Sequence, residues 1–178
     1  IYAAKRHHEA LDHPLTGWLG HADPFAFADD YIHATGMNRL LTGTPPILSL
    51  TALDAALDAF DGIDSNALRT KVADLTGLFI TLADQRLLRH GFALASPREA
   101  ARRGAVVSLS HEEGYAIMQA VIARNVIGDF RAPDVARFGF SPLTTRFVDV
   151  FDAAAVIDAV MTERAWDTPE FKSRKAVT

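Results

Sequence analysis

The longest regular pattern in this sequence is a stripe of apolar residues at helical spacing that continues for more than four turns. It begins after Asp64 or Ser65, either of which suits a helix start, and it ends near residue 82. The stripe consists of Leu68, Val72, Leu75, Phe79 and Leu82. One face of this helix must be buried against other elements. A helix of this length can join two domains, so the chain is expected to divide close to residue 64.

Beyond this helix, stretches with strand character alternate with stretches of helical spacing. Strands are predicted over 92–95, 105–109, from 126 onward and over 135–140, and helices over 115–123 and 147–161. Ser110 and Glu113 form an S-x-x-E capping pattern, and Asn125 suits the end of the first of these helices. Residues 128–133 are predicted to form a turn. The alternation predicts an α/β domain from about residue 65 onward.

Residues 1–64 have a different character and are interpreted as the tail of a larger unit. Residues 1–4 suggest a short strand, and residues 15–40 form a long irregular stretch rich in glycine, aspartate and aromatic residues. Long ordered loops are uncommon and often functional. Thr44 is a suitable N-cap for a helix that starts at Pro45.

Composition excludes several classes of site. The 178 residues include no cysteine, which rules out disulfides, thiolate metal sites and a cysteine nucleophile. The formal net charge of −4 argues against a nucleic-acid surface, and no apolar run approaches the roughly 20 residues that span a membrane. Residues 1–13 have no signal-peptide pattern, so a cytoplasmic protein is expected. The chain starts without methionine on the apolar stretch IYAA, which suggests part of a longer polypeptide.

Two residues in the first part of the chain can bind an anion such as phosphate. The Thr44 hydroxyl stands at a predicted helix N-terminus, where free N–H groups attract anions, although Pro45 and Pro46 have none. The alternative for Thr44 is a simple N-cap. Trp18, in the segment GWLGH, carries one N–H donor that can reach a phosphate oxygen. The alternative for Trp18 is a buried core residue whose N–H meets a backbone carbonyl.

Arg137 interrupts the apolar strand VARFGF. Its planar guanidinium can bind a carboxylate through two parallel hydrogen bonds, and a charge on a core-facing strand needs such a partner. The alternatives are a structural ion pair with Asp129 or Asp134, or a solvent-facing position.

The histidines predict no metal site. His7, His8, Asp12 and His13 are metal-ligand types, but their spacing matches no zinc signature, and a solvated loop is expected. His21 and His111 stand alone near loops and helix starts, where either can be structural.

Six segments follow one another in a recognisable order and spacing. They are GWLGH, GTPPILSL, LRTKVADLTGLFI, SPREAARRGAVVSLSHEEGYA, VIGDFRAPDVARFGFSPL and RFVDV. Together they resemble the kynureninase family over nearly the whole chain, from about Pro14 to the C-terminus. The combination of VIGDFR with RFGFSPL is the most specific part of this resemblance.

The resemblance implies a pyridoxal 5'-phosphate (PLP) enzyme of the aspartate-aminotransferase fold, fold type I, that acts as a homodimer with active sites at the subunit interface. Residues 1–64 would be the C-terminal tail of the large PLP-binding domain, and residues 65–178 a linking helix and the small C-terminal domain. The implied reaction, part of tryptophan catabolism, is hydrolysis of L-kynurenine or 3-hydroxykynurenine to L-alanine and anthranilate or 3-hydroxyanthranilate.

The resemblance also implies roles for three residues. Trp18 and Thr44 match residues that contact the PLP phosphate, and Arg137 matches the arginine that binds the substrate α-carboxylate. The lysine that forms the Schiff base is expected upstream of Ile1, since KRHHEA around Lys5 does not resemble its segment. No catalytic residue is therefore expected in this chain, which by itself should be inactive.

Two departures from the family pattern leave the choice between the two substrates open. Leu19 stands where relatives carry phenylalanine, and Thr144 stands where they commonly carry tyrosine. Another PLP enzyme of the same fold, such as a desulfurase or an aminotransferase, is an alternative that a substrate panel would separate. A catalytically silent binding or assembly domain is the second alternative, and it requires the segment to be a complete natural product.

Overall fold

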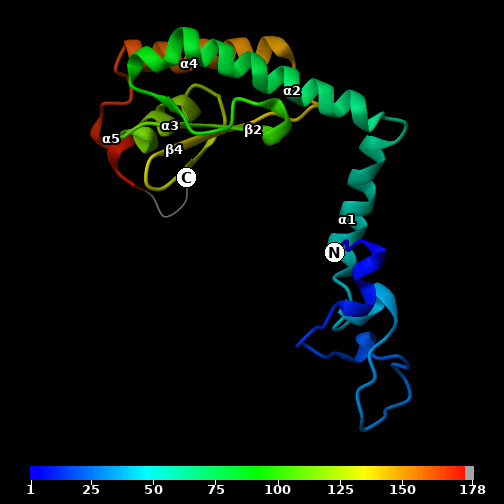
Figure 1. The fold of residues 1–178 in the computed structure, drawn as a ribbon. Coiled ribbons are helices and arrows are strands. Elements are labelled where there is room, and N and C mark those ends of the chain that lie inside the picture. Colours follow the sequence, from blue (N-terminus) through cyan, green and yellow to red (C-terminus); the bar gives the residue numbers. More distant parts are fainter. Residues whose placement is uncertain (175–178) are drawn as a thin grey trace. The chain divides into compact units, whose positions relative to one another are not determined.

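The computed structural model describes residues 1–174, which form two compact units (Figure 1). The first unit is Ile1–Gly62 and the second begins at Ile63. No helix among the described residues is long and apolar enough to cross a membrane.

The second unit is built on a four-stranded sheet. Its strands are β1 (Ala93–Leu94), β2 (Val106–Ser110), β3 (Asp129–Arg131) and β4 (Val135–Gly139), in the order β1-β2-β4-β3. Every neighbouring pair is antiparallel. The predicted mixture of helices and strands is confirmed, but the sheet is not the parallel sheet typical of an α/β domain. The reason is that β3 and β4 are joined by only three residues, which form a hairpin.

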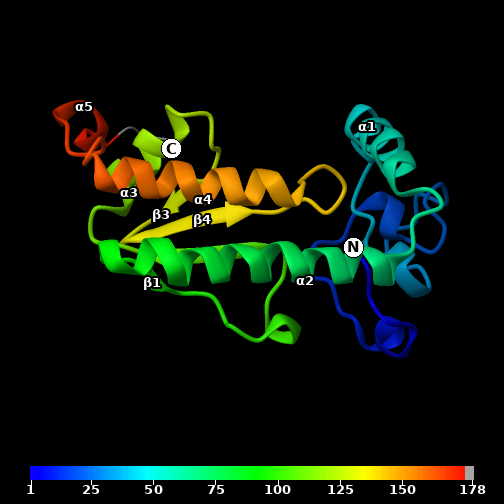
Figure 2. The same ribbon diagram turned by 90° about the horizontal axis from the view of Figure 1, so that it is seen from above.

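The helices of this unit cover one face of the sheet. They are α2 (Ser65–Leu82), α3 (Gly114–Ile122), α4 (Phe147–Thr162) and the short α5 (Pro169–Lys172). Helices α2 and α4 lie side by side along the sheet (Figure 2), and α3 packs against β3, β4 and α4. The predicted start of α2 is confirmed, with Asp64 as N-cap accepting a hydrogen bond from the Asn66 N–H at 2.9 Å. A π-helical turn and a 3-10 turn, Ala83–Leu87 and Leu88–His90, continue α2.

Residues alternate between the two faces of the sheet. The buried face carries Val107, Leu109, Phe130, Ala136 and Phe138. Phe79 of α2 packs on this face, with its ring centroid 5.1 Å from that of Phe138. The opposite face carries Ser108, Asp129, Arg131 and Arg137, none of which is buried. The core therefore lies between one side of the sheet and the helices, and the other side is open.

Three local predictions in this unit are wrong. The strand predicted from residue 126 onward begins only at Asp129. Residues 128–133 are not a turn, because 129–131 form β3 and only 132–134 turn. Ser110 and Glu113 form no capping box. Instead the Glu113 N–H donates to Nδ1 of His111 at 3.0 Å. Asn125, predicted to end α3, has the left-handed conformation expected there, with φ 65°.

The first unit consists mainly of irregular chain and 3-10 turns, as predicted for residues 15–40. The turns are Lys5–Ala10, Trp18–Gly20, Gly36–Leu40 and Asp58–Phe60. The strand predicted over residues 1–4 is absent. The buried guanidinium of Arg39 holds the unit together by donating to the Ala34 carbonyl at 3.3 Å and the Leu11 carbonyl at 3.0 Å. Its Nη2 also pairs with Oε2 of Glu9 at 3.2 Å.

Helix α1 (Ile47–Leu57) begins two residues later than predicted. Pro46 is its N-cap and no side chain caps it, so the prediction of Thr44 as the N-cap is wrong. Two consecutive prolines delay the helix because Pro46 disfavours the helical conformation at Pro45. No residue of α1 is buried.

Candidate functional site

Two loops of the first unit meet backbone to backbone, and glycines make this possible. A Cβ atom at Gly17 would lie 1.8 Å from the Thr42 carbonyl oxygen, and one at Gly20 would lie 2.6 Å from the Leu41 carbonyl oxygen. Any other residue at these positions would push the loops apart. The GWLGH loop is thereby held against the residues that lead into GTPPI.

The side chain of Trp18 projects from this junction. It is 48% exposed and makes an edge-on contact with Phe25, with ring centroids 5.7 Å apart. Its Nε1 lies 3.9 Å from the position that a Cβ at Gly43 would occupy. Within residues 1–174 the indole N–H makes no hydrogen bond. Trp18 is therefore not the buried core residue considered as its alternative.

Thr44 follows Gly43 directly and is exposed. It does not cap α1, so its hydroxyl oxygen accepts no helix N–H, and its O–H can donate to a ligand. The first N–H groups of α1 also lack partners within the helix, as at any helix N-terminus. An indole N–H, a hydroxyl and a helix N-terminus therefore gather in one short region, and each of them favours an anion.

A hollow of about 430 Å³ adjoins Trp18 in the same unit. Its lining includes the aromatic residues Trp18, Phe25, Phe27 and Tyr31, together with His21 and three aspartates. Such a lining accommodates a planar ring that carries polar groups.

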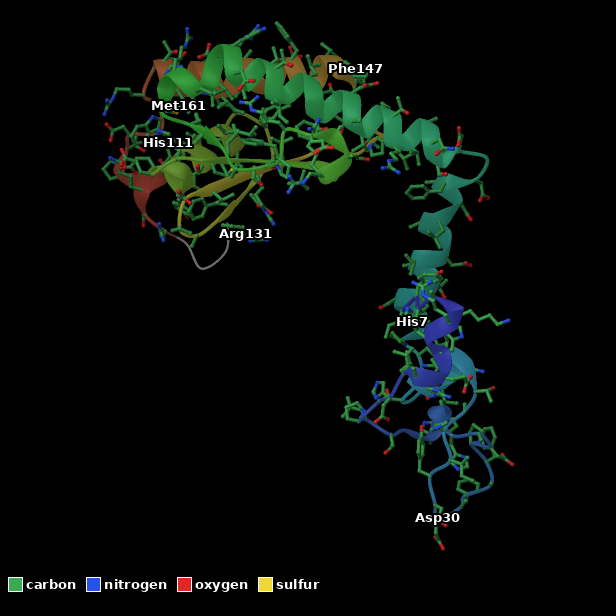
Figure 3. All side chains as sticks on the ribbon, in the orientation of Figure 1. His7, Asp30, His111, Arg131, Phe147 and Met161 are labelled. Carbon is green, nitrogen blue, oxygen red and sulfur yellow. The ribbon has the colours of Figure 1, made fainter. Side chains whose placement is uncertain are left out.

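Arg137 lies on the open face of the sheet, where it pairs with Asp129 across β3 and β4. Its Nε and Nη2 donate to the two carboxylate oxygens of Asp129, each at 2.6 Å. The Arg137 side chain is 37% exposed and that of Asp129 38% exposed. The partner is thus Asp129 rather than Asp134. Arg131, labelled on the side of the sheet away from α2 and α4 in Figure 3, approaches the same carboxylate at 3.5 Å.

This pairing stabilises the charged form of both groups. The hydrogen bonds from Arg137 hold the pKa of the Asp129 carboxyl below its usual range, against the effect of partial burial. Asp129 in turn raises the pKa of Arg137 through the same hydrogen bonds. Both residues are therefore charged at neutral pH. The sequence indicated Asp129 only as one alternative. If residues 129–131 had been interpreted as the first strand of a hairpin, the strand register would have placed Asp129 opposite Arg137.

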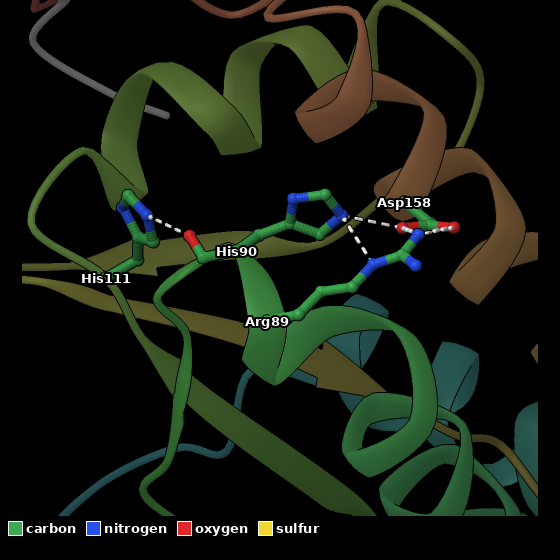
Figure 4. A network of polar contacts seen from close by, with 4 residues as sticks. All are labelled: Arg89, His90, His111 and Asp158. Atoms are coloured by element: carbon green, nitrogen blue, oxygen red, sulfur yellow. Dashed lines mark hydrogen bonds and ion pairs between the residues drawn. The ribbon is translucent and has the colours of Figure 1, made fainter.

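The histidines have structural contacts. Nε2 of His111 lies 3.1 Å from the His90 carbonyl oxygen, and the His90 ring contacts Asp158 beside Arg89 (Figure 4). The His21 ring stacks edge-on against Tyr31, with centroids 5.6 Å apart. Nowhere in residues 1–174 do three or more histidine, aspartate or glutamate side chains gather as metal ligands would. Sequence reasoning missed the contact of Arg89 and His90 with Asp158, because Asp158 is 68 residues away from His90 in the chain.

Comparison with known proteins gives one consistent result. The family model described as the kynureninase C-terminal domain matches residues 68–157. A kynureninase of Burkholderia mallei is 43% identical over all 178 residues, and that of Burkholderia pseudomallei has the same identity. A kynureninase of Pseudomonas fluorescens is 44% identical over 170 residues, or 96% of this chain. The chain spans about 43% of the length of the Burkholderia proteins and 41% of the Pseudomonas protein.

Proposed function

Because the chain belongs to the kynureninase family, we propose that the full-length protein hydrolyses L-kynurenine or 3-hydroxykynurenine. The products would be L-alanine and anthranilate or 3-hydroxyanthranilate, which places the reaction in tryptophan catabolism. The full-length subunit would have fold type I and act as a cytoplasmic homodimer. The observation that carries the proposal is the match to kynureninases across the whole chain, together with the donor cluster at Trp18 and Thr44.

The residues of the first unit fit the phosphate group of PLP. A phosphate needs several hydrogen-bond donors, and the junction supplies the unpaired indole N–H of Trp18 and the exposed hydroxyl of Thr44. The N-terminus of α1 adds N–H groups and a favourable dipole. When bound, PLP would supply the electron sink for bond cleavage at the substrate amino acid. The role of Trp18 and Thr44 is to hold and orient the cofactor.

Arg137 would bind the α-carboxylate of the substrate. A guanidinium provides five N–H donors, and the pair with Asp129 uses only two of them. The remaining donors can form a second two-point contact with a carboxylate. This contact would fix the orientation of the amino-acid part of the substrate.

The direct test is a substrate panel with the purified full-length protein and PLP. Release of anthranilate from kynurenine, or of 3-hydroxyanthranilate from its hydroxy form, is the expected result, and the ratio of the two kcat/KM values gives the preference. Sulfur release from cysteine or amino transfer to a keto acid would instead indicate a desulfurase or an aminotransferase. A protein that binds PLP but transforms none of these compounds would support the silent domain.

A further inference from the structure

The contact between Arg137 and Asp129 has a defined orientation. The carboxylate occupies the side of the guanidinium that carries Nε and Nη2, with both donor–acceptor distances at 2.6 Å. The pair therefore leaves both N–H groups of Nη1 and one N–H of Nη2 without a partner in the contact. These remaining donors lie at the end of the guanidinium, where Nη1 and Nη2 can each donate one of two parallel hydrogen bonds to a second carboxylate.

The backbone fixes Asp129 in this position. Asp129 and Arg137 are directly paired residues of β3 and β4, so their side chains leave the sheet on the same face. Before Asp129, Gly128 sits so close to the neighbouring strand that a Cβ there would lie 2.8 Å from the Arg137 carbonyl oxygen. The Cβ position is equally close to Cε of Met118 in α3. The start of β3 is therefore held between β4 and α3, and Asp129 has little room to shift.

The charges around the pair still favour an anion. Arg131 approaches Oδ2 of Asp129 at 3.5 Å, so two guanidinium groups face one carboxylate. The cluster carries a net positive charge, and Asp129 does not cancel the attraction for a carboxylate ligand. On the open face of the sheet, none of these three side chains is buried.

We propose that Asp129 is a positioning residue that fixes the Arg137 guanidinium side-on, so that its free end receives the α-carboxylate of the substrate. This inference rests on the proposed function. An unrestrained arginine side chain loses conformational entropy whenever it binds, whereas an arginine already held by Asp129 has lost most of that freedom beforehand. The contribution of Asp129 should therefore appear in substrate binding and depend on the substrate carboxylate.

The test uses the full-length holoenzyme with Asp129→Asn, which keeps the size of the side chain and removes its charge. Asp134→Asn is the matched control, since Asp134 lies in the adjoining turn and has no side-chain contact with Arg137. For Asp129→Asn we expect KM for kynurenine to rise on the order of tenfold, as for loss of a charged hydrogen bond, with kcat changed much less. Asp134→Asn should leave both constants close to those of the wild type.

A ligand without the carboxylate separates positioning from a general structural effect. Kynuramine is kynurenine without its α-carboxylate, and its inhibition constant should be the same in the wild type and in Asp129→Asn. Equal weakening of kynuramine and kynurenine, or a KM that stays at the wild-type value, would overturn the inference. A wild-type enzyme that does not cleave kynurenine would overturn the proposed function, and this inference with it.

Discussion

Nε2 of His90 lies 2.7 Å from Oδ1 of Asp158, which connects the 3-10 turn after α2 to the C-terminal half of α4. The same carboxylate accepts two hydrogen bonds from Nη2 of Arg89, at 2.8 and 3.0 Å. Partial burial would raise the pKa of Asp158, but the hydrogen bonds from His90 and Arg89 outweigh it and lower that pKa. Two helices of the second unit are thus joined by a charged contact whose strength depends on pH.

The first prediction concerns stability in acid. Because the pKa of Asp158 is lower in the folded than in the unfolded chain, its contribution is fully present above the unfolded value of about 4. It is lost as the pH falls through the lower, folded-state value. Asp158→Asn should therefore reduce the free energy of unfolding by about 1–2 kcal/mol at neutral pH and flatten its decline below pH 4. Denaturant titrations between pH 3 and pH 7 measure this, with exposed Asp152→Asn as the control on the same helix. Parallel pH curves for wild type and Asp158→Asn would contradict it.

The second prediction concerns Arg137→Lys in the full-length enzyme. An ammonium has three N–H donors, so it cannot make a two-point contact with Asp129 and a second two-point contact with a substrate carboxylate at the same time. We expect kcat/KM for kynurenine to fall about tenfold or more, mainly through KM. Steady-state kinetics measure the change, and an unaltered kcat/KM would show that Arg137 is purely structural.

The third prediction concerns Trp18 and Thr44. If both contact one phosphate, Trp18→Phe and Thr44→Val should each weaken PLP binding, and their effects should not add in the double variant. Because Thr44 does not cap α1, Thr44→Val should leave the melting temperature of the PLP-free protein unchanged. Cofactor titrations of the single and double variants, with melting of the apoenzyme, test both points. An apoenzyme that melts earlier while PLP affinity stays constant would reject the assignment for that residue.

The fourth prediction concerns the contact between the two loops. Gly17→Ala places a methyl group where the Thr42 carbonyl oxygen stands, 1.8 Å from the Cβ position. It should cost about 1–3 kcal/mol of stability in the full-length protein and weaken PLP binding, because Trp18 moves with its loop. Gly104→Ala is a suitable control, since nothing lies within 4 Å of the Cβ position there. Equal PLP affinity in the two variants would mean that the loop contact does not position the indole.

The fifth prediction concerns the 178-residue chain by itself. By the family resemblance the Schiff-base lysine is expected upstream of Ile1, and covalent catalysis on PLP needs that amine. With added PLP, the purified chain should release no anthranilate from kynurenine. Turnover that copurifies with the chain through successive columns would disprove this.

The sequence predicted the long elements well, because they depend on many residues at once. The apolar stripe of α2 and the helix from Phe147 have enough turns for their spacing to be unambiguous. Strand β3 has only three residues and follows a glycine, so its local composition resembles a turn. What makes it a strand is pairing with β4, which is a tertiary effect.

The candidate site was predictable in its residue types and not in its contacts. Trp18, Thr44 and Arg137 could be chosen from the sequence because each has a distinctive hydrogen-bonding group. The contacts that surround these residues could not be predicted from the sequence. The approach of Trp18 to Gly43 depends on the fold of a loop, and the choice of Asp129 over Asp134 depends on strand register. A one-residue change in that register would have moved Asp129 to the other face of the sheet.

The two faces of the sheet also bear on how this protein can evolve. Phe130, Ala136 and Phe138 fill the core, while their chain neighbours Asp129, Arg131 and Arg137 stand on the open face. Substitutions at alternate positions of the same strands therefore fall into separate classes, one that alters packing and one that, under the proposed role of Arg137, alters ligand recognition. A library confined to the open face could search for new amino-acid specificities while the thermal tolerance of the scaffold is preserved.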